Sequence, residues 1–145
     1  PEIQRFIPDR FESQDEMGEV IAWLRGNYGK PDFIRLTYAI AAGETLVGWV
    51  STGPLPSDES RRELAYCVHP DHWGRGIAAS AARAFLAWLR SSGPARELHA
   101  EVDPDNVASI RVLESCGFIR VGSVVDKDSG ASKYLYALQS SSQGD

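Results

Sequence analysis

The sequence has 145 residues, of which 43% are hydrophobic and 24% charged, an ordinary composition for one globular domain. This composition excludes disordered, collagen-like and coiled-coil chains. Fifteen Lys and Arg residues against 20 Asp and Glu residues leave a formal charge of −5, so we expect no broad nucleic-acid-binding surface. No apolar run approaches the roughly 18 residues of a membrane span, and no signal-peptide pattern is expected at the start.

The two cysteines, Cys67 and Cys116, fit no metal-binding spacing and are too few for a disulfide scaffold. We therefore expect two reduced thiols in a cytoplasmic protein that has no metal site. The sequence starts at Pro1 rather than at a methionine, which leaves open whether residues precede it in the native chain.

Apolar residues at helical spacing predict three helices, and runs of β-branched and aromatic residues predict six strands. In chain order these are a helix at 13–28, strands at 32–42, 45–52 and 63–68, a helix at 76–90, a strand at 97–102, a helix at 106–116, and strands at 118–125 and 133–138. Residues 53–62, with two prolines, are predicted to form an exposed loop, and residues 140–145 a polar tail.

This order predicts the α/β class. Strand–helix–strand units favour parallel pairing and hairpins favour antiparallel pairing, so we expect one mixed, mostly antiparallel sheet flanked by helices. No repeat, low-complexity tract or linker divides the chain. We therefore expect a single domain over residues 1–139.

The most informative stretch runs from Val68 to Ala79, where a strand ends near Pro70 and two glycines lead into a helix. A helix N-terminus offers unpaired N–H groups, and glycines let a phosphate approach the backbone. Arg75 adds a positive charge beside them. A simple tight turn is the alternative. The stretch lacks the Gly-Lys-Ser/Thr of a P-loop and the last glycine of G-x-G-x-x-G.

A different family matches this stretch. The segment Trp73-Gly74-Arg75-Gly76-Ile77-Ala78 resembles the Gln/Arg-x-x-Gly-x-Gly/Ala loop of the GNAT N-acetyltransferases, particularly the branch of ribosomal-protein N-terminal acetyltransferases. A second segment, from Asn106 to Phe118, is similar to the family's Asn-x-x-Ser…Glu-x-x-Gly-Phe pattern. The two segments occur in the family's order, and the resemblance covers residues 33–138.

The resemblance implies the acyl-CoA N-acyltransferase fold, with acetyl-CoA as co-substrate. The backbone of Val68 would pair with the pantetheine arm, and Asn106 would also contact the cofactor. The Tyr66 N–H would lie near the thioester oxygen, where a donor stabilises developing negative charge. Ser109 would lie near the sulfur and return a proton to the thiolate. The loop that would hold the pyrophosphate comprises Trp73, Gly74, Arg75, Gly76, Ile77, Ala78 and Ala79.

This sequence departs from the family pattern in three places. In the family, a strand and a helix that help to wall the acceptor cleft usually precede the segment with which this sequence starts, and we expect them to be lacking here. Trp73 replaces a side chain able to hydrogen-bond a phosphate, and Ser80 replaces an acid common in this branch.

Several candidates have structural alternatives. Glu63, Glu101 and Asp103 are candidate general bases, with Glu63 assigned to the site, or else solvated charges. Asn106 could serve only as a helix cap, and the Ser109 hydroxyl could simply face solvent.

The lack of an evident strong base favours an acceptor that is easily deprotonated. A lysine amine is only about 0.04% neutral at pH 7, whereas a protein α-amine is about 10–17% neutral. We therefore predict direct acetyl transfer to a primary amine, either a peptide N-terminus or a small molecule. A covalent route through Cys67, a non-catalytic acyl-CoA sensor and a plain interaction domain are the alternatives. A homodimer is left open.

Overall fold

The computed structural model describes residues 13–30, 34–92 and 97–138. The predicted tail and the start of the first strand, at 32–33, lie outside these ranges. The elements are α1 (Gln14–Asn27), β1 (Leu36–Ala42), β2 (Thr45–Leu55), β3 (Asp58–Val68), the short 3-10 helix η2 (Pro70–His72), α2 (Ile77–Ser91), β4 (Leu98–Val102), α3 (Val107–Ser115), β5 (Ile119–Val125) and β6 (Ser132–Leu138).

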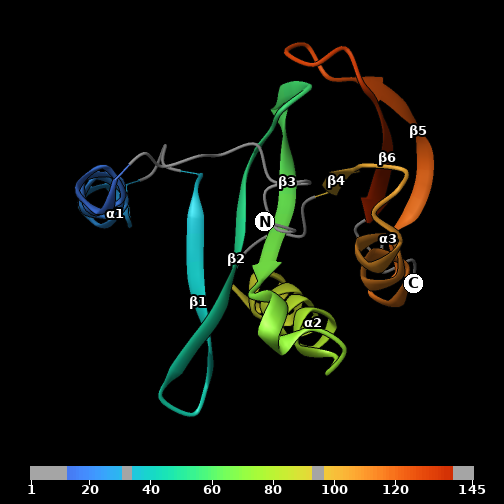
Figure 1. Cartoon of the computed structure of the whole chain (residues 1–145). Helices are drawn as coiled ribbons and strands as arrows, with labels where there is room; N and C mark the ends of the chain where they lie inside the picture. Colours follow the sequence, from blue (N-terminus) through green and yellow to red (C-terminus); the bar gives the residue numbers. More distant parts are fainter. Residues whose placement is uncertain (1–12, 31–33, 93–96, 139–145) are drawn as a thin grey trace.

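The six strands form one sheet in the order β1-β2-β3-β4-β6-β5 (Figure 1). Every neighbouring pair is antiparallel except β3 and β4, which are parallel. The α/β class and the mostly antiparallel mixed sheet are therefore confirmed. One detail of the expected pairing is wrong. The unit β4-α3-β5 forms no parallel pair, because the β5–β6 hairpin places β6 against β4 along its full length.

The predicted exposed loop at 53–62 is also wrong. These residues extend β2 and β3 into a long hairpin that turns at 56–57. Pro54 is accommodated next to a register irregularity, and proline is tolerated in strands at such bulges because it donates no ladder bond. Leu55 is completely buried, so its side chain anchors this end of the hairpin in the protein, although Pro56, Glu59 and Ser60 are exposed. The prolines and polar residues of this segment are typical of a loop, and for that reason the sequence did not predict the strand pair.

The core lies on the face of the sheet that α2 and α3 cover. Ala82, Phe85 and Leu86 of α2 and Leu113 of α3 pack there against Leu64 and its neighbours on the central strands. In contrast, α1 has no buried residue and lies beside the β1 edge (Figure 1). No helix in the described ranges is long and apolar enough to cross a membrane.

Candidate functional site

The parallel strands β3 and β4 pair at only two positions, Arg62 with Leu98 and Glu63 with His99. Beyond them β3 continues to Val68 without a β4 partner, and we call this separation the β3–β4 splay. The His69 N–H donates to the Val47 carbonyl (2.8 Å), which sets the alternation of hydrogen bonds toward β2. The backbone N–H and C=O groups of Tyr66 and Val68, beyond the last pair, therefore point into the splay.

Trp73 connects the loop after β3 to the end of that strand. Its indole Nε1–H donates to the Val68 carbonyl at 2.7 Å, and its backbone N–H donates to the Pro70 carbonyl at 3.1 Å. The family resemblance implies that the backbone of Val68 pairs with a pantetheine arm, and the carbonyl of this residue thus already accepts one hydrogen bond. Because a carbonyl oxygen has two lone pairs, it can accept a second.

The N-terminus of α2 carries no side-chain cap. Gly74 and Gly76 adopt left-handed conformations (φ 75° and 72°), and a Cβ added at either would meet no atom within 4 Å. Gly76 is the N-cap, makes no side-chain bond, and accepts the first helical bond, from the Ser80 N–H, at 3.0 Å. The amides of 77–79 therefore lie at an open surface with exposed Arg75 beside them. This arrangement fits a phosphate or diphosphate.

The N-terminus of α3 is closed by side chains instead. Asn106 Oδ1 accepts the Ser109 N–H at 3.2 Å, and Asp103 Oδ1 accepts the Asp105 N–H at 2.8 Å in the preceding turn. The expected helix cap at Asn106 is therefore present, and any contact of Asn106 with a cofactor would be additional to it.

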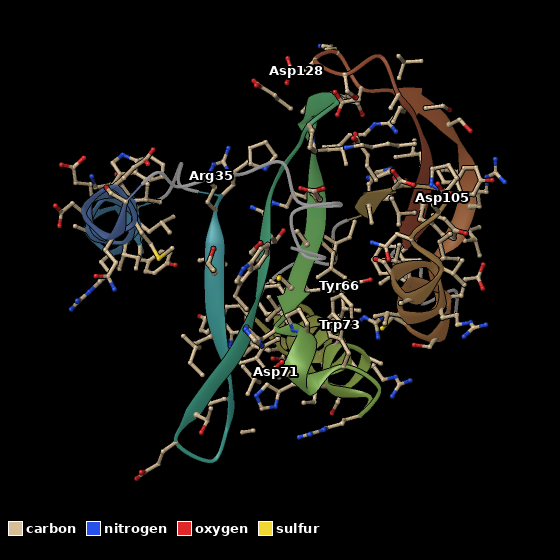
Figure 2. The ribbon with its side chains drawn as sticks, viewed as in Figure 1. Arg35, Tyr66, Asp71, Trp73, Asp105 and Asp128 are labelled. Atoms are coloured by element: carbon tan, nitrogen blue, oxygen red, sulfur yellow. The ribbon has the colours of Figure 1, made fainter. Side chains whose placement is uncertain are left out.

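Tyr66 and Ser109 meet between β3 and α3. The Tyr66 hydroxyl lies 2.9 Å from Ser109 Oγ and 3.1 Å from the Ser109 carbonyl oxygen, which accepts from it. Figure 2 shows Tyr66 near the carboxyl end of β3, on the side facing α3, with Trp73 close by. Burial raises the pKa of Tyr66 to about 12, with the Ser109 hydrogen bond opposing this shift. Tyr66 is therefore a neutral phenol.

The three candidate bases have different surroundings. Glu101 accepts the Ser57 N–H at 2.9 Å and so holds the β2–β3 hairpin end, while Asp103 stabilises the turn before α3. Glu63 is half-buried at the vertex of the splay, opposite His99. Side chains alternate along a strand, so Glu63 lies on the sheet face opposite Leu64 and the two covering helices.

Both cysteines are free thiols. Burial raises the pKa of the Cys67 thiol, which disfavours the thiolate needed for nucleophilic attack. His69, two residues along the chain, contacts Asp71, whose N–H donates to its Nδ1 at 3.3 Å. Among the described ranges, no group of three or more His, Cys, Asp and Glu residues could hold a metal ion.

Sequence reasoning missed two polar side-chain contacts at this site. It used only the backbone N–H of Tyr66, whereas the side-chain hydroxyl meets Ser109. It also treated Trp73 as the loss of a phosphate donor, whereas its indole joins the loop to β3. Neither contact has a sequence signal, because each depends on the relative placement of separate elements.

The chain resembles known proteins over most of its length. A family model described as an acetyltransferase (GNAT) domain matches residues 1–119. An uncharacterized N-acetyltransferase, p20 of Bacillus licheniformis, is 23% identical over 108 residues, covering 72% of this chain and 61% of that protein. The FsC-acetyl coenzyme A-N(2)-transacetylase of Aspergillus fumigatus is 27% identical over 135 residues, covering 88% and 57%. The chain thus spans about 60% of the length of these relatives.

Solved structures have the same fold at low sequence identity. The ribosomal-protein-S5-alanine acetyltransferase of Vibrio fischeri superimposes with a TM-score of 0.78 at 16% identity, covering 97% of this chain and 84% of that one. Mycobacterium smegmatis RimJ in complex with CoA-disulfide gives 0.75 at 20% identity, covering 90% and 64%. Together with the family model, which spans well over half of the sequence, these likenesses show that the chain belongs to the GNAT acetyltransferase domain family.

Proposed function

We propose that this protein is an acetyl-CoA-dependent N-acetyltransferase that moves the acetyl group directly to a primary amine. The observation that carries the proposal is the continuity of the β3–β4 splay with the open N-terminus of α2. The backbone amides of β3 that face the splay are followed along the chain by the uncapped amides at the start of α2. An extended, amide-containing arm that ends in a diphosphate matches this path.

The diphosphate end is supported by charge and space. The amides of 77–79 carry the positive end of the α2 dipole, and no side chain competes for them. Gly74 and Gly76 leave the approach open. Val68 and Tyr66 backbone groups line the splay for the arm. RimJ, which shares the fold, was solved with CoA-disulfide.

Acetyl-CoA supplies a thioester: a C–N bond to the amine forms, the C–S bond breaks, and the electron pair goes to sulfur. The Tyr66 N–H donates to the oxygen on which negative charge grows. Ser109 donates a hydrogen bond to the departing sulfur, and Glu63 receives the amine proton through water or directly. No covalent enzyme intermediate is involved, in keeping with the raised pKa of Cys67.

A protein N-terminal α-amine is the favoured acceptor. Glu63 is the proposed base because it lies at the vertex of the β3–β4 splay. Glu101 and Asp103 instead accept the Ser57 and Asp105 N–H groups, at the end of the β2–β3 hairpin and in the turn before α3. A single base suffices for an α-amine because about a tenth of it is already neutral at pH 7. A small amine with a similarly low pKa meets the same requirement.

Thiol release with acetyl-CoA and a panel of N-terminal peptides, lysine-side-chain peptides and small amines tests the proposal. We expect release with α-amines, rising with pH through a midpoint near the α-amine pKa of about 7.7–8.0 and levelling above about pH 9, where the amine is neutral. Acetyl-CoA is expected to raise the melting temperature in a concentration-dependent way, because ligand at 100 times Kd adds about 2.7 kcal/mol to the free energy of unfolding. Stabilisation without release on any amine would instead indicate an acyl-CoA sensor. No stabilisation would reject both.

A further inference from the structure

The side-chain hydroxyl of Tyr66 has no part in the function proposed above. It lies 2.9 Å from Ser109 Oγ although 43 residues separate the two in the chain. A serine in the first turn of a helix ordinarily bonds to its own backbone or to water. Here Ser109 bonds instead to a phenol of another element.

Ser109 is held at three of its atoms. Asn106 Oδ1 accepts its N–H at 3.2 Å, while Tyr66 contacts its carbonyl oxygen at 3.1 Å and its Oγ at 2.9 Å. These contacts come from α3 itself and from β3. Together they define both the backbone position and the side-chain rotamer of Ser109 relative to the splay.

The Tyr66 and Ser109 hydroxyls have one proton each, which limits the hydrogen bonds that they can make to each other. The phenol has one proton, and the Ser109 carbonyl can only accept. When the phenol donates to that carbonyl, the Ser109 hydroxyl donates to the phenol oxygen. When the phenol turns toward Oγ, the Ser109 proton becomes available to another acceptor. The two arrangements differ only in the rotation of two O–H bonds.

We propose that the Tyr66 hydroxyl is a positioning group for Ser109, donating to its Oγ while Ser109 donates to the leaving sulfur. This inference rests on the proposed function. As the C–S bond breaks and the electron pair moves to sulfur, the chained hydrogen bonds polarise one another and stabilise the charge. Neither hydroxyl gives up its proton, because the proton lost by the amine balances the reaction.

The burial of Tyr66 suits this role. Its pKa of about 12 keeps the phenol protonated throughout the physiological pH range, so it remains a donor. The role requires only the hydroxyl of Tyr66 and not its aromatic ring. Tyr66→Phe therefore removes the proposed action and keeps the ring that packs against the core.

The test measures the pKa of the CoA thiol bound to the protein, by thiolate ultraviolet absorbance, together with kcat. We expect the bound thiol pKa to lie below that of free CoA. Ser109→Ala is expected to return it toward the free value, and Tyr66→Phe to raise it by about 0.5 to 1 unit with a three- to tenfold lower kcat, the worth of one hydrogen bond. The KM for acetyl-CoA is expected to stay within about twofold.

A double-mutant cycle separates positioning from a general structural effect. If Tyr66 acts through Ser109, Tyr66→Phe adds nothing in the Ser109→Ala background. Tyr136→Phe is the matched control, because Tyr136 is a buried phenol that donates to Glu114 Oε1 of α3 at 3.2 Å. It is expected to lower the melting temperature without changing the thiol pKa. Ser109→Thr, which keeps a hydroxyl, is expected to restore most of the activity lost in Ser109→Ala.

The outcomes distinguish this proposal from the one on which it rests. Additive effects of Tyr66→Phe and Ser109→Ala, or a thiol pKa unchanged in both, would overturn the role of Tyr66 while leaving CoA binding intact. Absence of CoA binding by the parent protein would overturn the proposed function and this inference together. Should Tyr66→Phe not fold, an unchanged thiol pKa in Ser109→Ala alone would still reject the positioning role of Tyr66, because that role acts through Ser109.

Discussion

The helices α2 and α3, which follow the diverging strands β3 and β4, differ in whether a side chain caps their first backbone amides. At α3, Asn106 caps the Ser109 N–H, and Asp103 supports the turn before it. At α2, the N-cap is Gly76 in a left-handed conformation, and no side chain bonds to the first turn. The third helix, α1, is capped by Ser13, whose Oγ accepts the Glu16 N–H at 3.1 Å.

Among the α-helices that the structure describes, α1 and α3 have a side-chain cap and α2 has none, so the missing cap is a property of α2 alone. Glycine at an N-cap costs only about a few tenths of a kcal/mol relative to a polar cap, so leaving α2 open lowers stability slightly, and a bound anion can supply the missing acceptor. The capped α3, in contrast, holds Ser109 in place. One helix end is suited to binding an anion and the other to positioning a side chain.

Gly76→Glu is expected to have the largest effect, a loss of acetyl-CoA affinity of at least about 100-fold by calorimetric titration. The new carboxylate would occupy the anion site and repel the diphosphate, where a charge-assisted bond is worth about 1.5–3 kcal/mol. The left-handed backbone adds about 1–2 kcal/mol of strain.

Gly43→Glu is the matched control for that strain. Gly43 also has a positive φ (63°) and open space around its Cα, but it lies in the β1–β2 turn. It is expected to lose similar stability and to keep its affinity for acetyl-CoA. Equal loss of binding in both variants would show that strain, and not the anion site, explains Gly76→Glu.

Asn106→Ala tests the capped end. Loss of the cap is expected to cost about 1 kcal/mol and to lower the melting temperature by a few degrees. Ser13→Ala removes the same kind of bond from α1, which buries no residue, so its loss is expected to appear only as faster local hydrogen exchange. A shared fall in global stability would contradict this distinction between the two helices.

Trp73→Phe tests whether anion binding at the N-terminus of α2 requires the loop before this helix to be held against β3. Phe keeps an aromatic ring, smaller than the indole, but loses the 2.7 Å bond to the Val68 carbonyl. We expect acetyl-CoA to bind about three- to tenfold more weakly by titration, since one hydrogen bond that orders the loop is lost. Tighter binding would mean that the indole competes with the ligand for that carbonyl.

The smallest effect is expected at Cys67, one residue before the carboxyl end of β3. Because burial raises the pKa of this thiol, less thiolate exists at neutral pH and alkylation is expected to be slow, accelerating as the pH rises through the raised pKa. Peptide mapping after iodoacetamide treatment measures this. Cys67→Ala is expected to keep kcat within twofold, and a loss of all turnover would restore the covalent route.

Local patterns in the sequence were enough to predict the helices, most strands, the Asn106 cap and the glycine-rich start of α2. Each depends on residues a few positions apart, where capping, periodicity and glycine conformation decide the backbone. The strands over 53–62 escaped, because Pro54 and polar residues mark a loop unless the partner strand and the burial of Leu55 are known.

Contacts between distant segments were decided only by the tertiary structure. The length of the β3–β4 pairing depends on how two parallel strands diverge, which no residue pattern encodes. The Tyr66–Ser109 contact joins residues 43 positions apart. The same holds for Glu101, a candidate base that bonds to the Ser57 amide across the sheet. Such contacts depend on strand register and helix placement, which minimise the energy of the whole domain rather than that of any local segment.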